Sequence, residues 1–136
     1  MLREIQLKQN VAEEILESAR SAPSLESCGL LAGCDSVITR ALPARNVAAQ
    51  PTTAYEIAPE ELFRLMREIR ATGLELLGIY HSHPAGDNDP SKRDIARAYY
   101  PDAAYFILSP KPDAANPIRA FSIRDSRATE LDIQIT

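Results

Sequence analysis

The sequence has few of the residues that mark specialised classes of protein. Of its 136 residues none is tryptophan, two are cysteine and two are histidine. The two cysteines, Cys28 and Cys34, cannot form the disulfide framework of a small secreted domain, and they favour a reducing compartment. Acidic residues number 19 against 15 basic ones, a net charge of −4. This charge excludes a generally basic surface for nucleic acid.

Long apolar segments are also missing. The first ten residues carry charges at Arg3, Glu4 and Lys8 and lack the apolar centre of a signal peptide. No apolar run approaches the ~18 residues that a membrane-spanning helix needs. We therefore expect a cytoplasmic protein that binds neither membranes nor nucleic acid.

What remains is the composition of one globular domain. Apolar residues make up 45% of the chain and charged residues 25%, close to globular averages. A chain of this length buries roughly two-thirds of its unfolded surface, so it needs neither disulfides nor a structural metal to form a core. No repeat, low-complexity tract or linker divides the chain, which predicts a single domain over residues 1–136.

The spacing of apolar residues predicts alternating helices and strands. A helix is predicted at residues 11–20, with a capping box between Asn10 and Glu13. A second begins at Pro59 and ends before Gly73, and a short third runs from Asp89-Pro90 to about residue 99. The strand candidates are residues 2–7, 27–33, 37–42, 52–57, 74–83, 104–109, 118–124 and 129–135. Together they predict a mixed sheet with two long helices and one short helix.

Both histidines stand in one stretch, Gly78-Ile79-Tyr80-His81-Ser82-His83-Pro84. Alternate side chains of a strand share a face, so His81 and His83 should project together, with Cα atoms about 6.6 Å apart. Two imidazole nitrogens at that spacing can converge on one metal ion. An H-x-H pair also occurs as a surface pair at a strand end or as core histidines hydrogen-bonded to the backbone, so a metal site requires a third ligand.

Asp94 is the candidate for that third ligand. A strand, a turn and the start of a helix would bring it back beside the histidines. Two imidazoles and one carboxylate suit zinc and leave the fourth position to water, which is typical of catalytic sites. The spacing Ser91-x-x-Asp94 is also that of a helix capping box, and Asp87 and Asp89 are rival ligands.

Metal-dependent hydrolysis also needs a base, for which Glu26 is the candidate. It precedes the apolar run 27–33, and a carboxylate at the mouth of a buried strand can reach a site between neighbouring strands. Partial burial would raise its pKa towards the working range. A solvated loop glutamate would have the same spacing.

These residues together resemble the motif of the JAMM (MPN+) metalloproteases. That motif is a glutamate, a distant H-[ST]-H-P, a serine eight residues beyond the second histidine and an aspartate three residues further. Here the intervals from His83 to Ser91 and from Ser91 to Asp94 are eight and three residues. Residues 26–33 resemble the E-x-C-G-[LV]-L-x-G of the small prokaryotic members. The resemblance covers essentially the whole chain.

The resemblance implies a fold, a cofactor and residue roles. The fold is the α/β MPN (JAB1/MPN, cytidine-deaminase-like) fold, a mixed curved β-sheet flanked by two long helices and one short helix. One Zn²⁺ with a catalytic water would be bound by His81, His83 and Asp94. Glu26 would be general base and proton donor, and Ser91 would stabilise the oxyanion. The sequence lets either Asp89 or Ser91 cap the third helix, and a capping Ser91 would have its hydroxyl partly committed to the backbone.

The resemblance also implies a substrate class. JAMM enzymes cleave the amide or isopeptide bond after the C-terminal glycine of ubiquitin-like proteins. The next predicted strand begins ten residues after Asp94, which leaves little room for the insertions with which eukaryotic deubiquitinases hold ubiquitin. The short form resembles prokaryotic enzymes that trim ubiquitin-like sulfur carriers to their Gly-Gly end. Removal of ubiquitin-like tags from conjugated proteins is a second expectation, and a homodimer is left open.

Other zinc-site patterns fail, and one other class of protein remains. The deaminase pattern H-x-E with P-C-x-x-C and the helical H-E-x-x-H are both missing from the sequence. The alternative is a non-catalytic MPN-type scaffold that binds partner proteins. Such scaffolds typically lack the metal residues, whereas this chain has the complete set.

Overall fold

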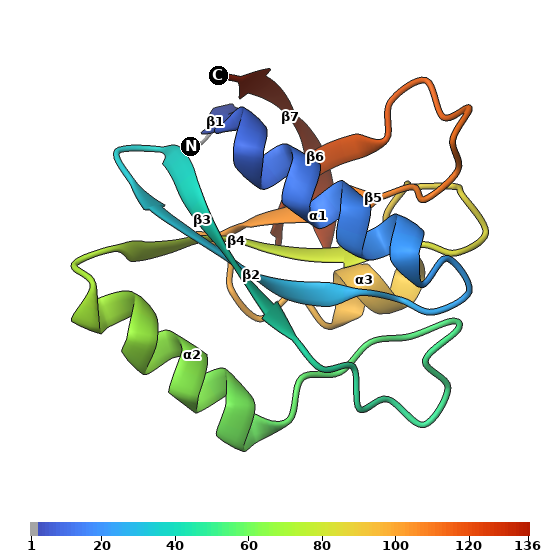
Figure 1. The fold of residues 1–136 in the computed structure, drawn as a ribbon, viewed down its shortest axis with the longest axis horizontal. Helices are drawn as coiled ribbons and strands as arrows, with labels where there is room; N and C mark the ends of the chain where they lie inside the picture. Colours follow the sequence, from blue (N-terminus) through green and yellow to red (C-terminus); the bar gives the residue numbers. More distant parts are fainter. Residues whose placement is uncertain (1–2) are drawn as a thin grey trace.

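In a computed structural model, residues 3–136 form a seven-stranded closed barrel with three helices (Figure 1). The elements are β1 (Glu4–Leu7), α1 (Gln9–Ser21), β2 (Cys28–Cys34), β3 (Val37–Ala44), α2 (Pro59–Ala71), β4 (Glu75–Ser82), α3 (Lys92–Ala96), β5 (Ala104–Leu108), β6 (Ile118–Arg124) and β7 (Arg127–Ile135). Neighbouring strands follow the order β1-β3-β2-β4-β5-β6-β7, and the parallel pairing of β7 with β1 closes the barrel. The expected mixed, curved sheet is confirmed, and it curves until its edges meet.

Strands β2 to β7 lie within two residues of their predicted bounds. The first predicted strand, residues 2–7, is found as β1, and residue 2 of that prediction lies outside the described residues. The central strands are apolar along their length because both of their faces are buried, as continuous apolar runs suggest. In β2, Leu31 belongs to one buried cluster, whereas its neighbours Leu30 and Ala32 belong to another.

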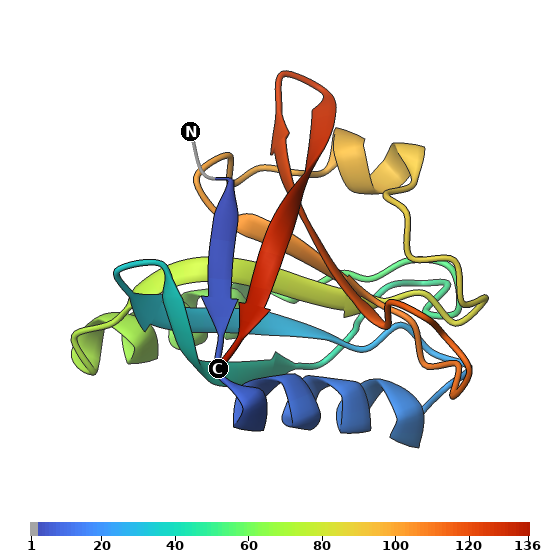
Figure 2. The ribbon, with the colours of Figure 1, turned by 90° about the horizontal axis from the view of Figure 1, so that it is seen from above.

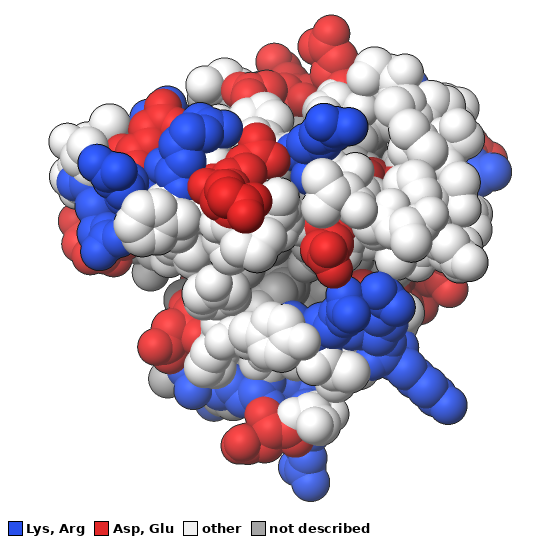
Figure 3. Space-filling model, turned by 90° about the horizontal axis from the view of Figure 1, so that it is seen from below, with Lys and Arg blue, Asp and Glu red and all other residues white. Residues whose placement is uncertain are grey.

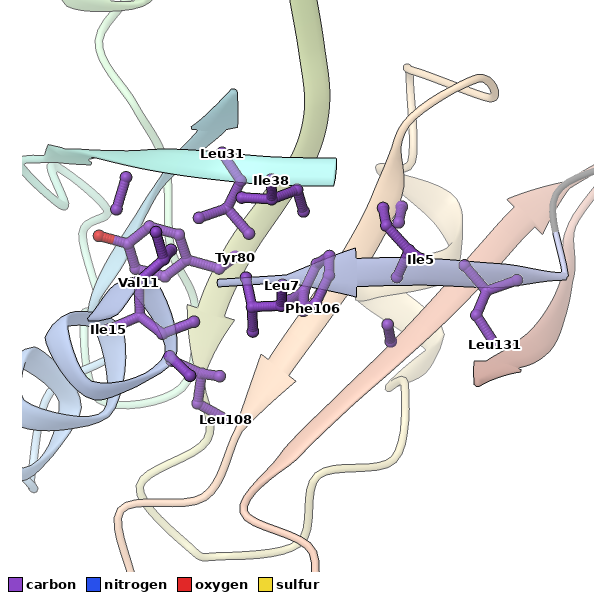
Figure 4. Close-up of a cluster of buried hydrophobic side chains, with 14 of the residues drawn as sticks. Ile5, Leu7, Val11, Ile15, Leu31, Ile38, Tyr80, Phe106, Leu108 and Leu131 are labelled. Atoms are coloured by element: carbon purple, nitrogen blue, oxygen red, sulfur yellow. The ribbon is translucent and has the colours of Figure 1, made fainter. Parts of the chain in front are cut away.

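The two clusters lie on the two faces of the sheet. The cluster in Figure 4 gathers side chains from all seven strands and from α1, including Ile15 of the helix, and fills the barrel. The second cluster lies outside the barrel and is covered by Leu65 and Ile69 of α2, with Ile95 of α3 packed against it. Figure 2 shows α1 and α3 on opposite sides of the strands. Asp94, one of the candidate metal ligands, belongs to α3 on the outer side of the sheet.

The helices differ from prediction at two of their starts. The expected capping box of α1 is wrong: the helix begins after Lys8, without a side-chain cap, and Asn10 lies inside its first turn. Glu13 instead accepts a hydrogen bond from Gln9. The predicted start of α3 at Asp89-Pro90 is also wrong, because Ser91 caps the helix. The last residue of α3 is Ala96, so the predicted extension to about residue 99 is wrong as well.

The second helix is confirmed. α2 begins at Pro59 and ends at Ala71, and Gly73 follows with a φ of +74° in the left-handed region that favours glycine. No helix among the described residues combines the length and apolar character needed to cross a membrane.

The predicted strand at residues 52–57 is wrong. Residues in this segment form a turn and an irregular stretch, because the side chain of Asn46 bonds to backbone groups that a neighbouring strand would otherwise pair. Its amide donates to the carbonyl of Ala54 at 2.9 Å and its oxygen accepts from the N–H of Glu56 at 3.1 Å. The segment therefore lies as a loop beside the ends of β2 and β4.

Those two strand ends bring distant parts of the sequence together. β2 and β4 are antiparallel, and Cys28 at the start of β2 is paired with His81 near the end of β4. β5 lies parallel to β4 on its other side, with Ile107 opposite His81. Glu26 precedes β2 and His83 follows β4, so both lie at the same end of this antiparallel pair of strands.

Candidate metal centre

His81 and His83 point to the same side at the end of β4, as the strand alternation predicts. Their Nε2 atoms are 3.1 Å apart, and their ring centroids are 4.9 Å apart. The His81 side chain is buried, whereas that of His83 is 14% exposed. His83 is therefore the more accessible of the two histidines.

Asp94 completes the group from the first turn of α3. Its Oδ1 lies 3.1 Å from Nε2 of His81, and its Oδ2 lies 3.0 Å from Nε2 of His83. The N–H of Ser91 donates to Oδ2 at 2.9 Å, and the N–H of Asp94 donates to Oγ of Ser91 at 3.0 Å. The capping box and the contact with the histidines are therefore both present. The cap fixes the direction of the carboxylate that faces the imidazoles.

The donor atoms of these three residues fit a zinc ion. One donor atom from each lies within 4.8 Å of the others. Ligand atoms of a tetrahedral zinc with bonds of about 2.1 Å lie roughly 3.4 Å from one another, close to the spacing found here. Nδ1 of His83 lies 2.6 Å from the carbonyl oxygen of Asp87, which holds the proton on Nδ1 and leaves the Nε2 lone pair free for a metal.

His81 is held by a different contact. Its Nδ1 has no hydrogen-bond partner among residues 3–136. The ring of Tyr55 stacks on the imidazole instead, with centroids 4.5 Å apart and an angle of 21° between the planes. Sequence reasoning missed Tyr55, because this residue lies in the segment wrongly predicted as a strand.

The surroundings favour a neutral His81 and an ionised Asp94, whereas they favour the protonated form of His83. Burial lowers the pKa of His81 below its ordinary value. Burial acts to raise the pKa of Asp94, but hydrogen bonds from His81 and His83 hold it well below its usual range. Burial would also lower the pKa of His83, but its bonds to Asp94 and to the carbonyl of Asp87 outweigh burial and raise the pKa. A metal ion at this group would therefore compete with a proton for His83.

Glu26 lies beside this group and is buried, with 6% of its surface exposed. Burial raises its pKa to about 7, and the charges of His83 and Asp94 also act on it. The solvated loop glutamate that the sequence left open is therefore not what the structure contains. A carboxylic acid with this pKa can accept and return a proton near neutral pH.

The rival ligands point elsewhere. The carboxylate of Asp89 forms an ion pair with Arg119. Asp87 contacts His83 only through its backbone carbonyl, and its Oδ1 accepts from the N–H of Asp89 at 3.1 Å. A backbone carbonyl carries no residue-specific signal, so sequence reasoning could not have found this contact.

Solved structures with the same fold define the class of the domain. A solution structure of a protein from Desulfitobacterium hafniense matches with a TM-score of 0.85 and 31% identity, covering 97% of this chain and 92% of the other. A JAB1/MPN domain protein from Archaeoglobus fulgidus matches with a TM-score of 0.64 and 20% identity, covering 96% and 97% of the two chains. The chain has the JAB1/MPN fold.

Sequence relatives then identify the family. Residues 8–124 match the model of the prokaryotic homologs of the JAB domain, and the chain belongs to this family. It is 40% identical to a desampylase of Haloferax volcanii over 105 residues, 76% of each chain. It is 46% identical over 112 residues to a probable TtuB-protein conjugate cleaving protease of Thermus thermophilus, covering 82% of this chain and 70% of the relative. A CysO-cysteine peptidase of Mycobacterium tuberculosis is 28% identical over 131 residues, 95% of this chain and 89% of the relative.

Proposed function

We propose that this protein is a zinc metallopeptidase that hydrolyses the amide or isopeptide bond after the C-terminal Gly-Gly of a ubiquitin-like or sulfur-carrier protein. The observation that carries the proposal is the convergence of the donor atoms of His81, His83 and Asp94 beside the buried Glu26. We assign one zinc ion per chain to the first three residues. Three protein ligands leave one position open, which is the arrangement of catalytic rather than structural zinc sites.

Bound zinc supplies a Lewis acid that polarises the scissile carbonyl and lowers the pKa of a coordinated water to ~7. The residues of the chain move the protons. Glu26, with its pKa raised to about 7 by burial, accepts a proton from the attacking water and passes it to the leaving amine. Glu26 contributes no ligand atom to the group of three donors, so its carboxylate stays available for this task.

Ser91 can cap α3 and still stabilise an oxyanion. The cap uses Oγ as an acceptor for the N–H of Asp94, which leaves the hydroxyl proton free to be donated. We expect Ser91→Ala to retain zinc and to lose about 10²–10³-fold in kcat, the effect of removing one oxyanion donor. Rate and zinc content measured on the same preparation check this, and an unchanged kcat would remove Ser91 from the mechanism.

The names of the relatives support the substrate class. They are called a desampylase, a TtuB-protein conjugate cleaving protease and a CysO-cysteine peptidase. A Gly-Gly end suits the site because glycine has no side chain to keep the backbone away from the reacting groups. The unstructured tail brings little surface, so we assign most of the affinity to the folded body of the carrier.

A cavity beside the site offers room for the residues that precede Gly-Gly. Its volume is about 290 Å³, and Asp94 forms part of its wall. The walls are largely apolar and aromatic, and Arg93 and Arg97 of α3 also line it. Figure 3 shows the face that carries α2, with a hollow near its middle and basic side chains gathered beside the hollow. We assign this cavity to the substrate tail.

The test is mass spectrometry of the products formed from a sulfur-carrier protein that bears a C-terminal extension after Gly-Gly. We expect one cleavage, directly after the second glycine, and little activity on short peptides with the same tail. Unfolded casein is the comparison substrate. Cleavage of casein at scattered sites, with the carrier fusion left intact, would indicate a general peptidase and overturn the proposal.

A non-catalytic scaffold is the second candidate, and metal content separates the two. Purified protein should hold about one zinc per chain. A chain that retains no zinc after mild purification, and takes up none on addition, would favour the scaffold.

We propose that residues 1–136 form one domain, because the cluster that fills the barrel joins all seven strands described in residues 3–136. We propose a cytoplasmic protein whose partner is the tail of its ubiquitin-like substrate, with no nucleic-acid or membrane partner. Size-exclusion chromatography would settle whether the protein is a homodimer.

A further inference from the structure

Ser82 stands between the two histidines but faces away from them. Alternation along β4 places its side chain on the opposite side of the strand from His81 and His83. Its exposed fraction is 0%. A substrate bound on the histidine side therefore cannot touch the Ser82 hydroxyl.

The Ser82 hydroxyl bonds instead to the residues on either side of Glu26. Its Oγ accepts a hydrogen bond from the N–H of Ser27 at 2.8 Å and donates to the carbonyl of Leu25 at 3.4 Å. The N–H of Ser82 donates to the carbonyl of Ser27 at 2.9 Å. One serine therefore holds the backbone immediately before and immediately after the glutamate.

Glu26 needs such an attachment because it lies beyond the end of the strand pairing. The last pair between β2 and β4 is Cys28 with His81, two residues after Glu26. Among residues 3–136, the hydrogen bonds of Glu26 are made by its backbone, so the position of the residue depends on that backbone. That backbone has two further anchors, the carbonyl of Pro51, which accepts from the Glu26 N–H at 2.8 Å, and the amide of Asn46, which donates to the Glu26 carbonyl at 3.0 Å.

We propose that Ser82 is a positioning residue for Glu26. By bonding to Leu25 and Ser27 it fixes the backbone that carries the glutamate relative to the strand that carries the two histidines. The inference rests on the proposed function, in which Glu26 moves the protons. The zinc ligands and the proton carrier come from segments 55 residues apart in the sequence, and Ser82 links them directly.

The test compares zinc-loaded wild type, Ser82→Ala and Ser109→Ala on the Gly-Gly carrier fusion. Ser109 is the matched control: it is also fully buried and directly follows β5, the strand beside β4, but its Oγ only accepts from the nearby N–H of Lys111. The measurements are kcat, KM, zinc affinity by chelator competition and a crystal structure of each protein.

For Ser82→Ala we expect kcat to fall about 100-fold, the effect of a displacement of roughly 1 Å at a reacting group. KM and zinc affinity should change little, because neither the cavity nor the ligand set is altered. The crystal structure should show Leu25–Ser27 displaced from β4. Ser109→Ala should keep the wild-type kcat.

The kinetic and zinc-binding measurements can overturn the proposal in two ways. One is a wild-type kcat in Ser82→Ala. The other is a loss of zinc affinity as large as the loss of kcat, which would mean that Ser82 acts through the neighbouring histidines. If the wild type itself cleaves no Gly-Gly fusion, the proposed function fails. The crystal structures then decide separately, and an unmoved Glu26 in Ser82→Ala would overturn the positioning role.

Discussion

Asp94 uses its carboxylate for two purposes at once. Oδ2 accepts the backbone N–H that starts α3 and also faces His83, while Oδ1 faces His81. A capping aspartate cannot rotate freely, so the helix start orients a donor atom towards the imidazoles. The two interpretations that the sequence offered for Asp94 are thus parts of one arrangement.

Replacing Glu26 and Asp94 in separate variants distinguishes proton transfer from metal binding. We expect Glu26→Gln to abolish hydrolysis and keep zinc, because it removes a base and no ligand. Asp94→Ala should lose both, and it should also weaken α3 by about 1 kcal/mol through loss of its part in the cap. Zinc analysis and turnover on the carrier fusion check the pair. Normal turnover by Glu26→Gln would show that another group is the base.

The raised pKa of Glu26 predicts a pH dependence of stability for the metal-free protein. Its folded pKa is about 7, above the ordinary value of 4.5, because of burial. Between these two values the folded state keeps a proton on Glu26 that the unfolded state releases. The free energy of unfolding of the wild type therefore decreases as the pH rises from about 4.5 through 7. Replacing Glu26 by glutamine removes this loss, so the variant should gain roughly 2 kcal/mol over wild type between pH 5 and pH 8.

Urea unfolding of the metal-free proteins at pH 5 and pH 8 measures that gain. Glu17→Gln is the control, because Glu17 lies on the exposed side of α1. If the free energy of unfolding of Glu26→Gln differs from that of the wild type by the same amount at pH 5 and at pH 8, a buried, protonated Glu26 is contradicted.

At the scale of single elements, the site depends on how closely β2 packs between its neighbours. β2 pairs with β3 on one side and β4 on the other, and its first residues lead from Glu26 into the barrel. Gly29 allows this packing. A Cβ at that position would lie 2.6 Å from the carbonyl oxygen of Leu42 and 2.6 Å from the ring of Tyr80, closer than real contacts allow.

Gly29→Ala should therefore destabilise the protein by about 1–3 kcal/mol, the range for overpacked buried positions. Gly78→Ala, on the neighbouring β4, is the matched comparison, because its nearest contact would be the Phe106 ring at 3.0 Å. We expect a smaller loss there. Thermal unfolding of both variants measures the effects, and an equal Tm for Gly29→Ala and wild type would contradict the packing described.

At the scale of the whole molecule, we expect the fold not to depend on the candidate metal centre. The cluster that fills the barrel draws on all seven strands and α1, and it contains none of the three proposed ligands. Removing zinc should therefore preserve the far-UV circular dichroism spectrum and cooperative unfolding. The Tm should fall only by the amount that corresponds to the lost free energy of metal binding.

Treatment with a chelator, followed by thermal unfolding, checks this expectation. Asp94→Ala is the control, because a protein without the site should give the same Tm with and without chelator. Collapse of the spectrum on chelation would show that the zinc is structural.

Several features of the fold and site could be predicted from the sequence because they are local. The alternation of His81 and His83 and the apolar runs of β2 and β4 follow from the period of two along a strand. The spacing of apolar residues in α2 follows from the helical period, and Gly73 marks its end. The motif of Glu26, the histidines, Ser91 and Asp94 identified the family without any coordinates.

Other features depend on contacts between segments distant in the sequence. The closure of the barrel requires β7 to meet β1, which no local pattern records. The segment predicted as a strand at residues 52–57 became a loop because the Asn46 side chain bonds to its backbone, and this loop places Tyr55 against His81. Ser91 rather than Asp89 caps α3 through its capping box with Asp94, and the carboxylate of Asp89 pairs with Arg119, which lies 30 residues away in the sequence.

The sequence by itself determined which residues can carry the chemistry and on which elements most of them lie, because residue type and spacing act over a few positions. Only the tertiary structure decided how Glu26 comes to lie beside the candidate metal centre. Its position results from the pairing of β2 with β4 and from the bonds of Ser82 to the backbone on either side of it. Such long-range bonds depend on which donors and acceptors the folded chain brings to about 3 Å from each other, and local sequence preferences do not contain that information.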